Sequence, residues 1–266
     1  MRKTVFRSGV ITLIVLVLMG FAMKIMAVPA SQMYYEIKVY RINSTAQADV
    51  TDKFLKDAFI PAMHRAGIAK IGVFKPIETD TAAFGKLIYV FIPYKNYDQY
   101  FNLQGILEAD KVYQTAGKDF IDAPYTNPPF VRYESIFLKA FPLMPEFKVY
   151  SYATPPGERI YELRSYESWT EAKATKKIQM FNEGGEMAIF EKVGSNAVFY
   201  AQVLLGTLKP RLMYMTTYAD MKSHDEHWKA FGSHPDWLKL KALPEYANTV
   251  IKANAFLLHP TSYSDI

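Results

Sequence analysis

One pattern of sequence occurs twice in this chain, and the internal repeat limits the possible folds more than any other feature. Residues 35–40 read YEIKVY and residues 161–166 read YELRSY, with the same residue class at five of six positions. The two segments lie 126 residues apart in a chain of 266 residues. Both alternate with a period of two, which is typical of β-strands. We therefore expect two similar units, each opened by a strand.

The same series of elements follows each of these strands. In the first copy, apolar residues recur at every fourth position across residues 50–62, and Gly67 follows as a helix C-cap. In the second copy, helical spacing extends across residues 174–188. The later β-like runs are residues 68–77, 86–93 and 130–138 in the first copy, and residues 196–205, 210–218 and 249–258 in the second.

A second helix is expected before the last strand of each copy. The pairs Asn96 with Gln99 and Ser223 with Glu226 have the spacing of a capping box, in which the first side chain accepts an N–H group of the opening turn. The order of elements is therefore β-α-β-β-α-β, the ferredoxin-like unit with both helices on one face of an antiparallel sheet. The sequence predicts an α+β chain of two tandem ferredoxin-like domains.

The uncovered face of each sheet needs a partner, and the second copy is the nearest one. The repeat therefore predicts that the two units form an intramolecular pseudo-dimeric α/β barrel. We expect the domains at residues 31–141 and 158–266. Residues 142–157 are expected to link them, because their prolines neither continue a helix nor fit a central strand.

Strand alternation predicts which side chains face the partner sheet. Tyr35, Ile37 and Val39 share one face of the first strand, and we expect this apolar face to pack on the helices. The polar face of both opening strands is then expected to point between the sheets or to their rim. These candidate ligand-binding residues are Glu36, Lys38, Tyr40, Glu162, Arg164 and Tyr166.

Two interpretations of this polar set remain open. In the functional one the residues line a pocket, where a Lys or Arg orients an anionic or carbonyl group and a Glu or Tyr handles a proton. In the structural one each Glu pairs with a nearby cation and fixes how the two halves dock. Either interpretation buries charged groups, so alanine is expected to be poorly tolerated at these positions.

A family resemblance rests on these strands and on one further motif. The opening strands have the form Tyr-Glu-x-[Lys/Arg]-x-Tyr, and the second copy adds Trp228 and the run from His234 to Trp237, which reads HPDW. Together they resemble the NIPSNAP family over residues 33–141 and 158–259. The first copy lacks the Pro-x-Trp element around residues 110–113. The resemblance implies tandem ferredoxin-like domains of the dimeric α/β-barrel superfamily. Neighbouring families there include cofactor-independent monooxygenases, haem-degrading enzymes and ligand binders.

The first 30 residues have the pattern of an export signal. Three basic residues precede an apolar run of 14 residues, residues 10–23, and the small residues Val28 and Ala30 fit cleavage before Ser31. The run is shorter than the roughly 20 residues that span a bilayer. We expect an exported, periplasmic or secreted protein with cleavage after Ala30; the alternative is an uncleaved N-terminal membrane anchor.

Charge and motifs narrow the function further. Four of the excess positive charges lie in the first 30 residues, which leaves 27 cations against 26 acids in the rest and argues against nucleic-acid binding. The chain has no Cys, and phosphate-binding, hydrolase and EF-hand motifs are missing from its sequence. His224 and His227 share a helix face, but we interpret them as a solvated helix start, not a metal site.

We therefore expect an exported, NIPSNAP-like protein without cofactor or metal. Its expected role is non-catalytic, either binding a small apolar or amphipathic ligand or interacting with a protein. The alternative is a cofactor-independent monooxygenase or isomerase that acts in the barrel cavity. A cavity of at least ~300 Å3 with Glu or His at its floor favours an enzyme, and a collapsed interface filled with side chains favours the structural or interaction role. The sequence leaves a homo-oligomer open.

Overall fold

Eight strands form a closed barrel in the computed structural model, which describes residues 31–266. The strands are β1 (Tyr34–Arg41), β2 (Gly72–Pro76), β3 (Leu87–Tyr94), β4 (Arg132–Ala140), β5 (Ile160–Glu167), β6 (Asn196–Leu205), β7 (Arg211–Tyr218) and β8 (Lys252–Pro260). Around the barrel they follow the order β1-β3-β2-β8-β5-β7-β6-β4, with antiparallel neighbours throughout. The expected pseudo-dimeric barrel is confirmed.

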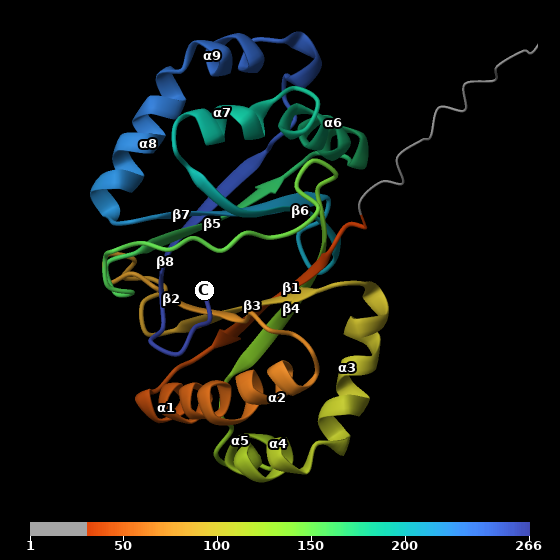
Figure 1. The fold of residues 1–266 in the computed structure, drawn as a ribbon, viewed down its shortest axis with the longest axis vertical. Coiled ribbons are helices and arrows are strands. Elements are labelled where there is room, and N and C mark those ends of the chain that lie inside the picture. The colour runs from red at the N-terminus through yellow and green to blue at the C-terminus, as the bar shows by residue number, and fades with distance from the viewer. Residues whose placement is uncertain (1–30) are drawn as a thin grey trace, which may run out of the picture.

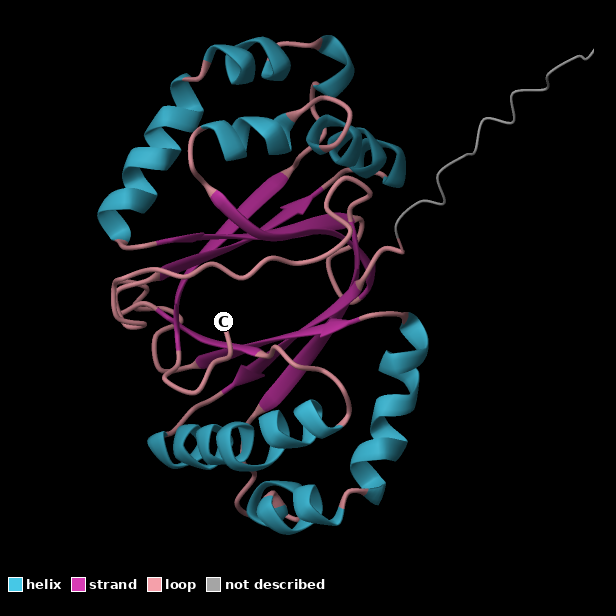
Figure 2. Cartoon of the chain, viewed as in Figure 1, coloured by secondary structure: helices cyan, strands magenta, loops and turns pink. Residues whose placement is uncertain are grey.

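Helices cover the outside of the barrel on two opposite sides (Figures 1 and 2). The first unit carries α1 (Thr45–Phe54), the π-helical η1 (Leu55–Phe59), α2 (Ile60–Arg65), α3 (Tyr97–Ala109), α4 (Lys111–Ala116) and α5 (Lys118–Ile121). The second unit carries α6 (Glu171–Phe181), α7 (Glu186–Lys192), α8 (Met221–Ser233), α9 (Pro235–Lys241) and the 3-10 turn η2 (Pro244–Tyr246). The molecule thus has four layers: helices, sheet, sheet, helices.

The two sheets are built alike and join at their edges. In each unit the opening strand is central: β1 pairs with β3 and β4, and β5 pairs with β7 and β8. The barrel closes where β4 pairs with β6 and where β2 pairs with β8. Because each seam joins the two units, neither sheet keeps a free edge, and edge pairing with other chains is avoided.

The interior of the barrel is packed with apolar side chains. Tyr35, Ile37 and Val39 of β1 point inward and meet residues of the second unit. The Tyr35 and Phe199 rings lie 5.3 Å apart, and the Phe91 and Phe199 rings lie 5.1 Å apart. The expectation that the apolar face of the opening strand packs on the helices is therefore wrong. A closed interior has no route to water for a charged group, so the apolar face lies inside and the polar face lies beneath the helices.

Several helix boundaries agree with those expected from the sequence, and two differ from them. Gly67 and Gly194 end the first helical stretch of each unit in the left-handed region, at φ of 80° and 77°. The second-unit stretch is interrupted between α6 and α7. The helix α8 begins earlier than expected: Asp220 is its N-cap and forms the capping box with Ser223. Ser223 therefore lies inside the helix, where its hydroxyl accepts the N–H of Asp220 and completes the capping box.

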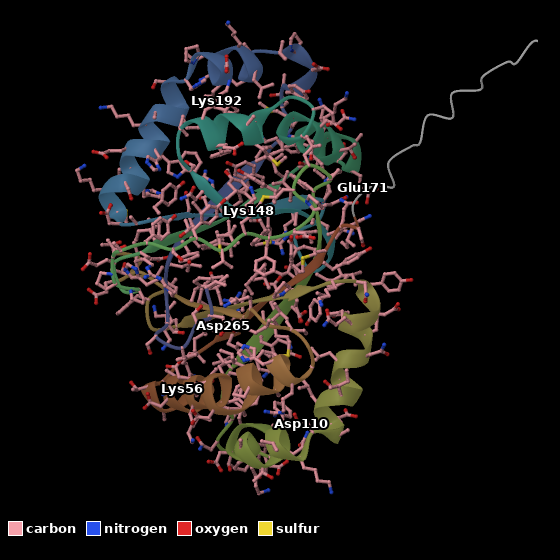
Figure 3. The ribbon with its side chains drawn as sticks, viewed as in Figure 1. Lys56, Asp110, Lys148, Glu171, Lys192 and Asp265 are labelled. Atoms are coloured by element: carbon pink, nitrogen blue, oxygen red, sulfur yellow. The ribbon has the colours of Figure 1, made fainter. Side chains whose placement is uncertain are left out.

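Each unit extends its last strand onto the other unit. The linker after β4 runs along β6, where the N–H groups of Phe141 and Lys148 donate to Tyr200 and Val198. The tail after β8 runs along β2 in the same way, where the N–H groups of Thr261 and Asp265 donate to Val73 and Ile71. Figure 3 labels Lys148 in the half that carries α7 and Asp265 in the half that carries α2.

The export signal, residues 1–30, lies outside the described residues, so the expectation of export stays a prediction. Across residues 31–266, none of the helices combines the length and the apolar character that a bilayer crossing requires.

Candidate functional site

The predicted polar residues lie outside the barrel, beneath the helices of their own unit. Glu36, Lys38 and Tyr40 face the helical layer of the first unit, while Glu162, Arg164 and Tyr166 face that of the second. The expectation that these six residues meet between the sheets is wrong, because the apolar faces fill that space. The two sets lie on opposite sides of the barrel and do not form one site. Whether either set binds a ligand stays a prediction.

Glu162 is the centre of a buried polar network in the second unit. Its side chain is 3% exposed. Arg164 Nη1 donates to Glu162 Oε1 at 2.7 Å, and the indole Nε1 of Trp228 donates to Oε2 at 2.5 Å. His224 Nε2 lies 3.3 Å from the same Oε2. The Arg164 guanidinium also lies 4.4 Å from the centroid of the Trp228 ring, a cation–π contact.

These contacts shift the two titrating groups in opposite directions. Burial by itself raises the pKa of Glu162, but His224, Arg164 and the Trp228 hydrogen bond outweigh it and hold that pKa below its usual value. Burial by itself lowers the pKa of His224, but Glu162 and Asp225 outweigh it and raise that pKa. His224 is buried, so its interpretation as a solvated helix start is wrong. It lies one turn into α8 and reaches the sheet because the helix begins three residues earlier than expected.

The corresponding residues of the first unit form a smaller network. Glu36 accepts hydrogen bonds from the Tyr94 hydroxyl at 2.8 Å and from Ser135 Oγ at 2.5 Å. Lys38 Nζ lies 3.7 Å from Glu36 and 5.6 Å from the Tyr133 ring centroid. The polar groups are therefore paired with one another. This arrangement agrees with the structural interpretation, although the pairs lie within each unit and not across the interface.

A cavity of about 450 Å3 lies elsewhere, between the linker and α7, above the first half of β6. The linker contributes Leu143, Met144, Lys148 and Tyr150; the turn before α7 and α7 itself contribute Asn182, Gly185, Met187, Ala188 and Glu191; the approach to β6 and β6 itself contribute Ser195, Asn196, Ala197 and Tyr200. We call this cavity the linker cleft. Its wall combines thioether and methyl groups with amide, hydroxyl and charged groups, the mixed lining typical of small-molecule sites.

The linker cleft exists because the linker follows a longer path than the tail. Between its two hydrogen bonds to β6 the linker advances from Phe141 to Lys148, whereas the tail advances from Thr261 to Asp265 over the same stretch of β2. The extra residues form a loop closed by the bridge between Phe141 and Met144. Small residues, Gly185, Ala188 and Ala197, leave the space beneath that loop open.

Tyr200 lines the linker cleft and is 2% exposed. Its hydroxyl has no hydrogen-bond partner among the described residues. Burial, assisted by the nearby Glu186, raises the pKa of Tyr200 well above its usual value, so the hydroxyl stays protonated and able to donate. An unpaired buried hydroxyl costs stability, about 1–3 kcal/mol, unless a ligand or water pairs with it. Tyr200 thus contributes to the wall of the cleft, while its hydroxyl is buried and exposes almost no surface.

The lining of the linker cleft offers apolar contacts and hydrogen-bonding groups. Over residues 31–266 no group of three or more His, Asp or Glu side chains gathers in a way that holds a metal ion. The cleft was missed from the sequence because the linker was interpreted only as a spacer. The available indication was the length of the segment between two pairs of prolines, Pro142 with Pro145 and Pro155 with Pro156. A segment of that length leaves room for a loop against the second unit.

Comparisons with known proteins agree with this architecture. The NIPSNAP family model matches residues 161–265. A candidate monooxygenase from Lactobacillus acidophilus is similar in structure over 86% of this chain and 94% of its own, with a TM-score of 0.56 and 13% identity. An anthrone oxidase-like protein covers 88% and 93%, with a TM-score of 0.51 and 7% identity. A NIPSNAP-like domain protein from Burkholderia xenovorans covers 40% of this chain and 89% of its own, with a TM-score of 0.37 and 20% identity.

No curated protein matches the sequence of the chain. At these low identities the similar structures establish the fold alone. The family match covers the unit that contains Glu162, Trp228 and the linker cleft's α7 and β6. The resemblance to the NIPSNAP family is therefore confirmed for the second unit, over residues 161–265, and the two units together form the dimeric α/β-barrel fold within one polypeptide.

Proposed function

We propose that this protein binds a small apolar or amphipathic molecule in the linker cleft. The observation that carries the proposal is the cavity of about 450 Å3, whose wall combines apolar side chains with amide, hydroxyl and charged groups. The volume lies within the range of roughly 300–1,000 Å3 that is usual for small-molecule sites. The barrel interior is a poorer candidate, because Tyr35, Phe91 and Phe199 pack against one another there.

The proposal includes the place where binding occurs. The leader, residues 1–30, has the order of an export signal: basic residues, an apolar run and small residues. We propose that the mature protein begins at Ser31 and meets its ligand outside the cytoplasm. The N-terminus of protein purified from the extracytoplasmic fraction of its own host, read by mass spectrometry, is expected to be Ser31.

A second candidate function is a cofactor-independent monooxygenase acting in the same cleft. It is favoured by the structural similarity to a candidate monooxygenase and to an anthrone oxidase-like protein. Without a cofactor the substrate itself has to supply the electrons that reduce dioxygen. The chain's contribution is then a cleft that holds the substrate between apolar and hydrogen-bonding side chains.

Blocking the linker cleft tests the binding proposal. Ala188 on α7 lines the cleft, and the matched control Ala230 is an exposed alanine on α8 outside it. Ala188→Trp fills the cavity and is expected to abolish the binding of an environment-sensitive dye such as 1,8-anilinonaphthalene sulfonate, while Ala230→Trp leaves the affinity unchanged. Equal dye affinity in both variants contradicts the proposal. Native mass spectrometry of the wild-type protein then identifies the bound molecule, and oxygen uptake with that molecule separates the enzyme from the binder.

A further inference from the structure

We propose that a second copy of this chain docks on the outer face of α3, so that two α3 helices pack antiparallel about a two-fold axis. The contact concerns the first unit and is independent of ligand binding in the linker cleft, which lies on the second. Three observations on the described residues carry the proposal: exposed aromatic side chains in one row of the helix, a glycine in the same row, and the contrast with the equivalent helix α8.

The outer face of α3 carries a row formed by Tyr97, Phe101 and Gly105. These residues are spaced by four, so they lie one above another along the helix. Tyr97 is 53% exposed and Phe101 is 66% exposed, whereas Leu103 and Leu107 on the inner face are buried. Two aromatic side chains exposed on successive turns form an apolar surface of the kind that marks a contact with another molecule.

The equivalent helix of the second unit, α8, has a charged row in the same place. Both helices have 13 residues and an N-cap side chain that accepts an N–H three residues later, so they align residue by residue. Phe101 then corresponds to Asp225, and Gly105 corresponds to Lys229. Figure 1 shows the two helices at opposite outer edges of the molecule. Because the fold gives both helices the same position, packing within the unit does not account for the apolar row of α3.

Gly105 points to close contact with another helix. It is exposed in the interior of α3, where glycine destabilises a helix relative to alanine. A Cβ added there meets no neighbouring atom within 4 Å, so the unit itself does not require the missing side chain. A glycine on the outer face leaves a hollow between the ridges of the helix, into which a side chain of a second helix fits. Phe101, one turn earlier, is a side chain of that kind.

The row is complementary to itself, and a second copy of the chain is therefore the partner that fits it. In an antiparallel pair of α3 helices, Phe101 of each copy lies over Gly105 of the other. The two contacts are identical, as a two-fold axis requires. Residues 99–107 carry no charged side chain, so like charges do not meet at the centre of the pair.

The charges at the two ends of α3 also suit antiparallel pairing. Lys95 and Asp98 lie at the start of the helix, while Glu108 and Lys111 lie at its end, and all four are exposed. Antiparallel pairing brings the start of one helix beside the end of the other, so two cations meet two carboxylates at each end. A pair of single helices is smaller than the usual interface of roughly 1,600 Å2, so we expect a weak and reversible dimer.

Sedimentation velocity over a range of concentrations tests the proposal on protein purified from the extracytoplasmic fraction of its host. Phe101→Asp places a charge at the centre of the contact, and its control is Leu238→Asp at a 44% exposed leucine on α9. Gly105→Gln fills the hollow without adding a charge. Its control is Gly232→Gln in the last turn of α8, where a Cβ also meets nothing within 4 Å.

We expect the wild type to form a dimer whose fraction rises with concentration. Phe101→Asp and Gly105→Gln are each expected to raise the dissociation constant at least about tenfold, and the two controls to leave it unchanged. A wild type that stays monomeric up to about 0.1 mM overturns the proposal, as does a dimer that either α3 variant leaves intact or that the controls weaken equally. If the monomer instead binds vesicles of phosphatidylcholine and phosphatidylglycerol, and Phe101→Asp abolishes that binding, the face docks on a membrane and the second copy is excluded.

Discussion

Glu162 shows how a single buried carboxylate is kept ionised beneath a helix. It has a cation on its own strand, Arg164, and two partners on α8, the imidazole of His224 and the indole of Trp228. The strand alone supplies only one of these partners. The helix therefore has to dock in one position for the charge to be compensated, which links the family motif around Trp228 to the packing of α8 on the sheet.

The first prediction concerns the pH dependence of this network. The pKa of His224 is raised above 6.5, so the stability that its protonated form contributes is complete below pH 6.5 and is lost as the pH rises through the folded value. The carboxylate of Glu162, whose pKa is lowered, keeps its contribution until the pH falls below 4.5. His224→Gln is therefore expected to lower the free energy of unfolding by about 2 kcal/mol at about pH 5.5, and by less at about pH 8.5.

Urea denaturation at the two pH values measures this difference. Trp228→Phe is the control, because it removes a hydrogen bond to Glu162 without removing a titrating group. Its cost is expected to be the same at both pH values. If the cost of His224→Gln also stays constant, the imidazole is not protonated in the folded protein and the account of its pKa is wrong.

At the level of residues the sequence grouped the polar side chains of each opening strand on one face, but the expected position of that face was wrong. The alternation in residues 35–40 and 161–166 correctly separated two faces, but it did not reveal which face pointed inward. Both faces of β1 are largely buried in the structure. That a face is buried therefore does not show whether it lies inside the barrel or beneath the helices. The deciding fact is closure of the barrel, which leaves Glu36 and Glu162 without a route to water on the inner side. Neighbouring strands set this condition, and one strand read alone does not show it.

Among the elements, the linker contributes most to the proposed site. It is a spacer in sequence but a wall of the cleft in the structure, because its loop at residues 142–147 stands away from β6. The strands and most helices were predictable from the period and the caps. The break between α6 and α7 was not, because apolar spacing continues across it; the turn depends on Asn182 and the left-handed Gly185.

A glycine substitution tests the turn that forms one side of the cleft. Gly185 has φ of 83° at the start of α7, and a Cβ there meets nothing within 4 Å. Gly185→Ala is expected to lower the free energy of unfolding by about 1–2 kcal/mol through backbone strain alone. Gly157→Ala in the linker is the control: a Cβ meets nothing there either, and φ lies outside the left-handed region. Thermal unfolding is expected to show no loss for the control, and a loss of equal size in both variants contradicts the role of φ.

At the scale of the whole molecule, the duplicated unit covers the second face of each sheet within one chain. The two sheets share an interior of side chains such as Tyr35, Phe91 and Phe199, and each unit lends a terminal segment to the other. The repeat predicted the pseudo-dimeric barrel from sequence, but it did not predict the exchange of terminal segments. The place of the cleft was not predictable, because it results from a difference between the copies. The linker segment along β6 is longer than the tail segment along β2.

The central claim is that ligands bind beneath the linker and not inside the barrel. Methyl NMR of protein labelled with 13C at methionine methyl groups separates the two, because Met144 and Met187 line the linker cleft while Met213 and Met215 lie in the barrel interior. On titration with 1,8-anilinonaphthalene sulfonate, the signals of Met144 and Met187 are expected to shift to saturation while those of Met213 and Met215 stay in place. Shifts of the barrel pair alone, or saturable binding that moves neither cleft methionine, contradict the account.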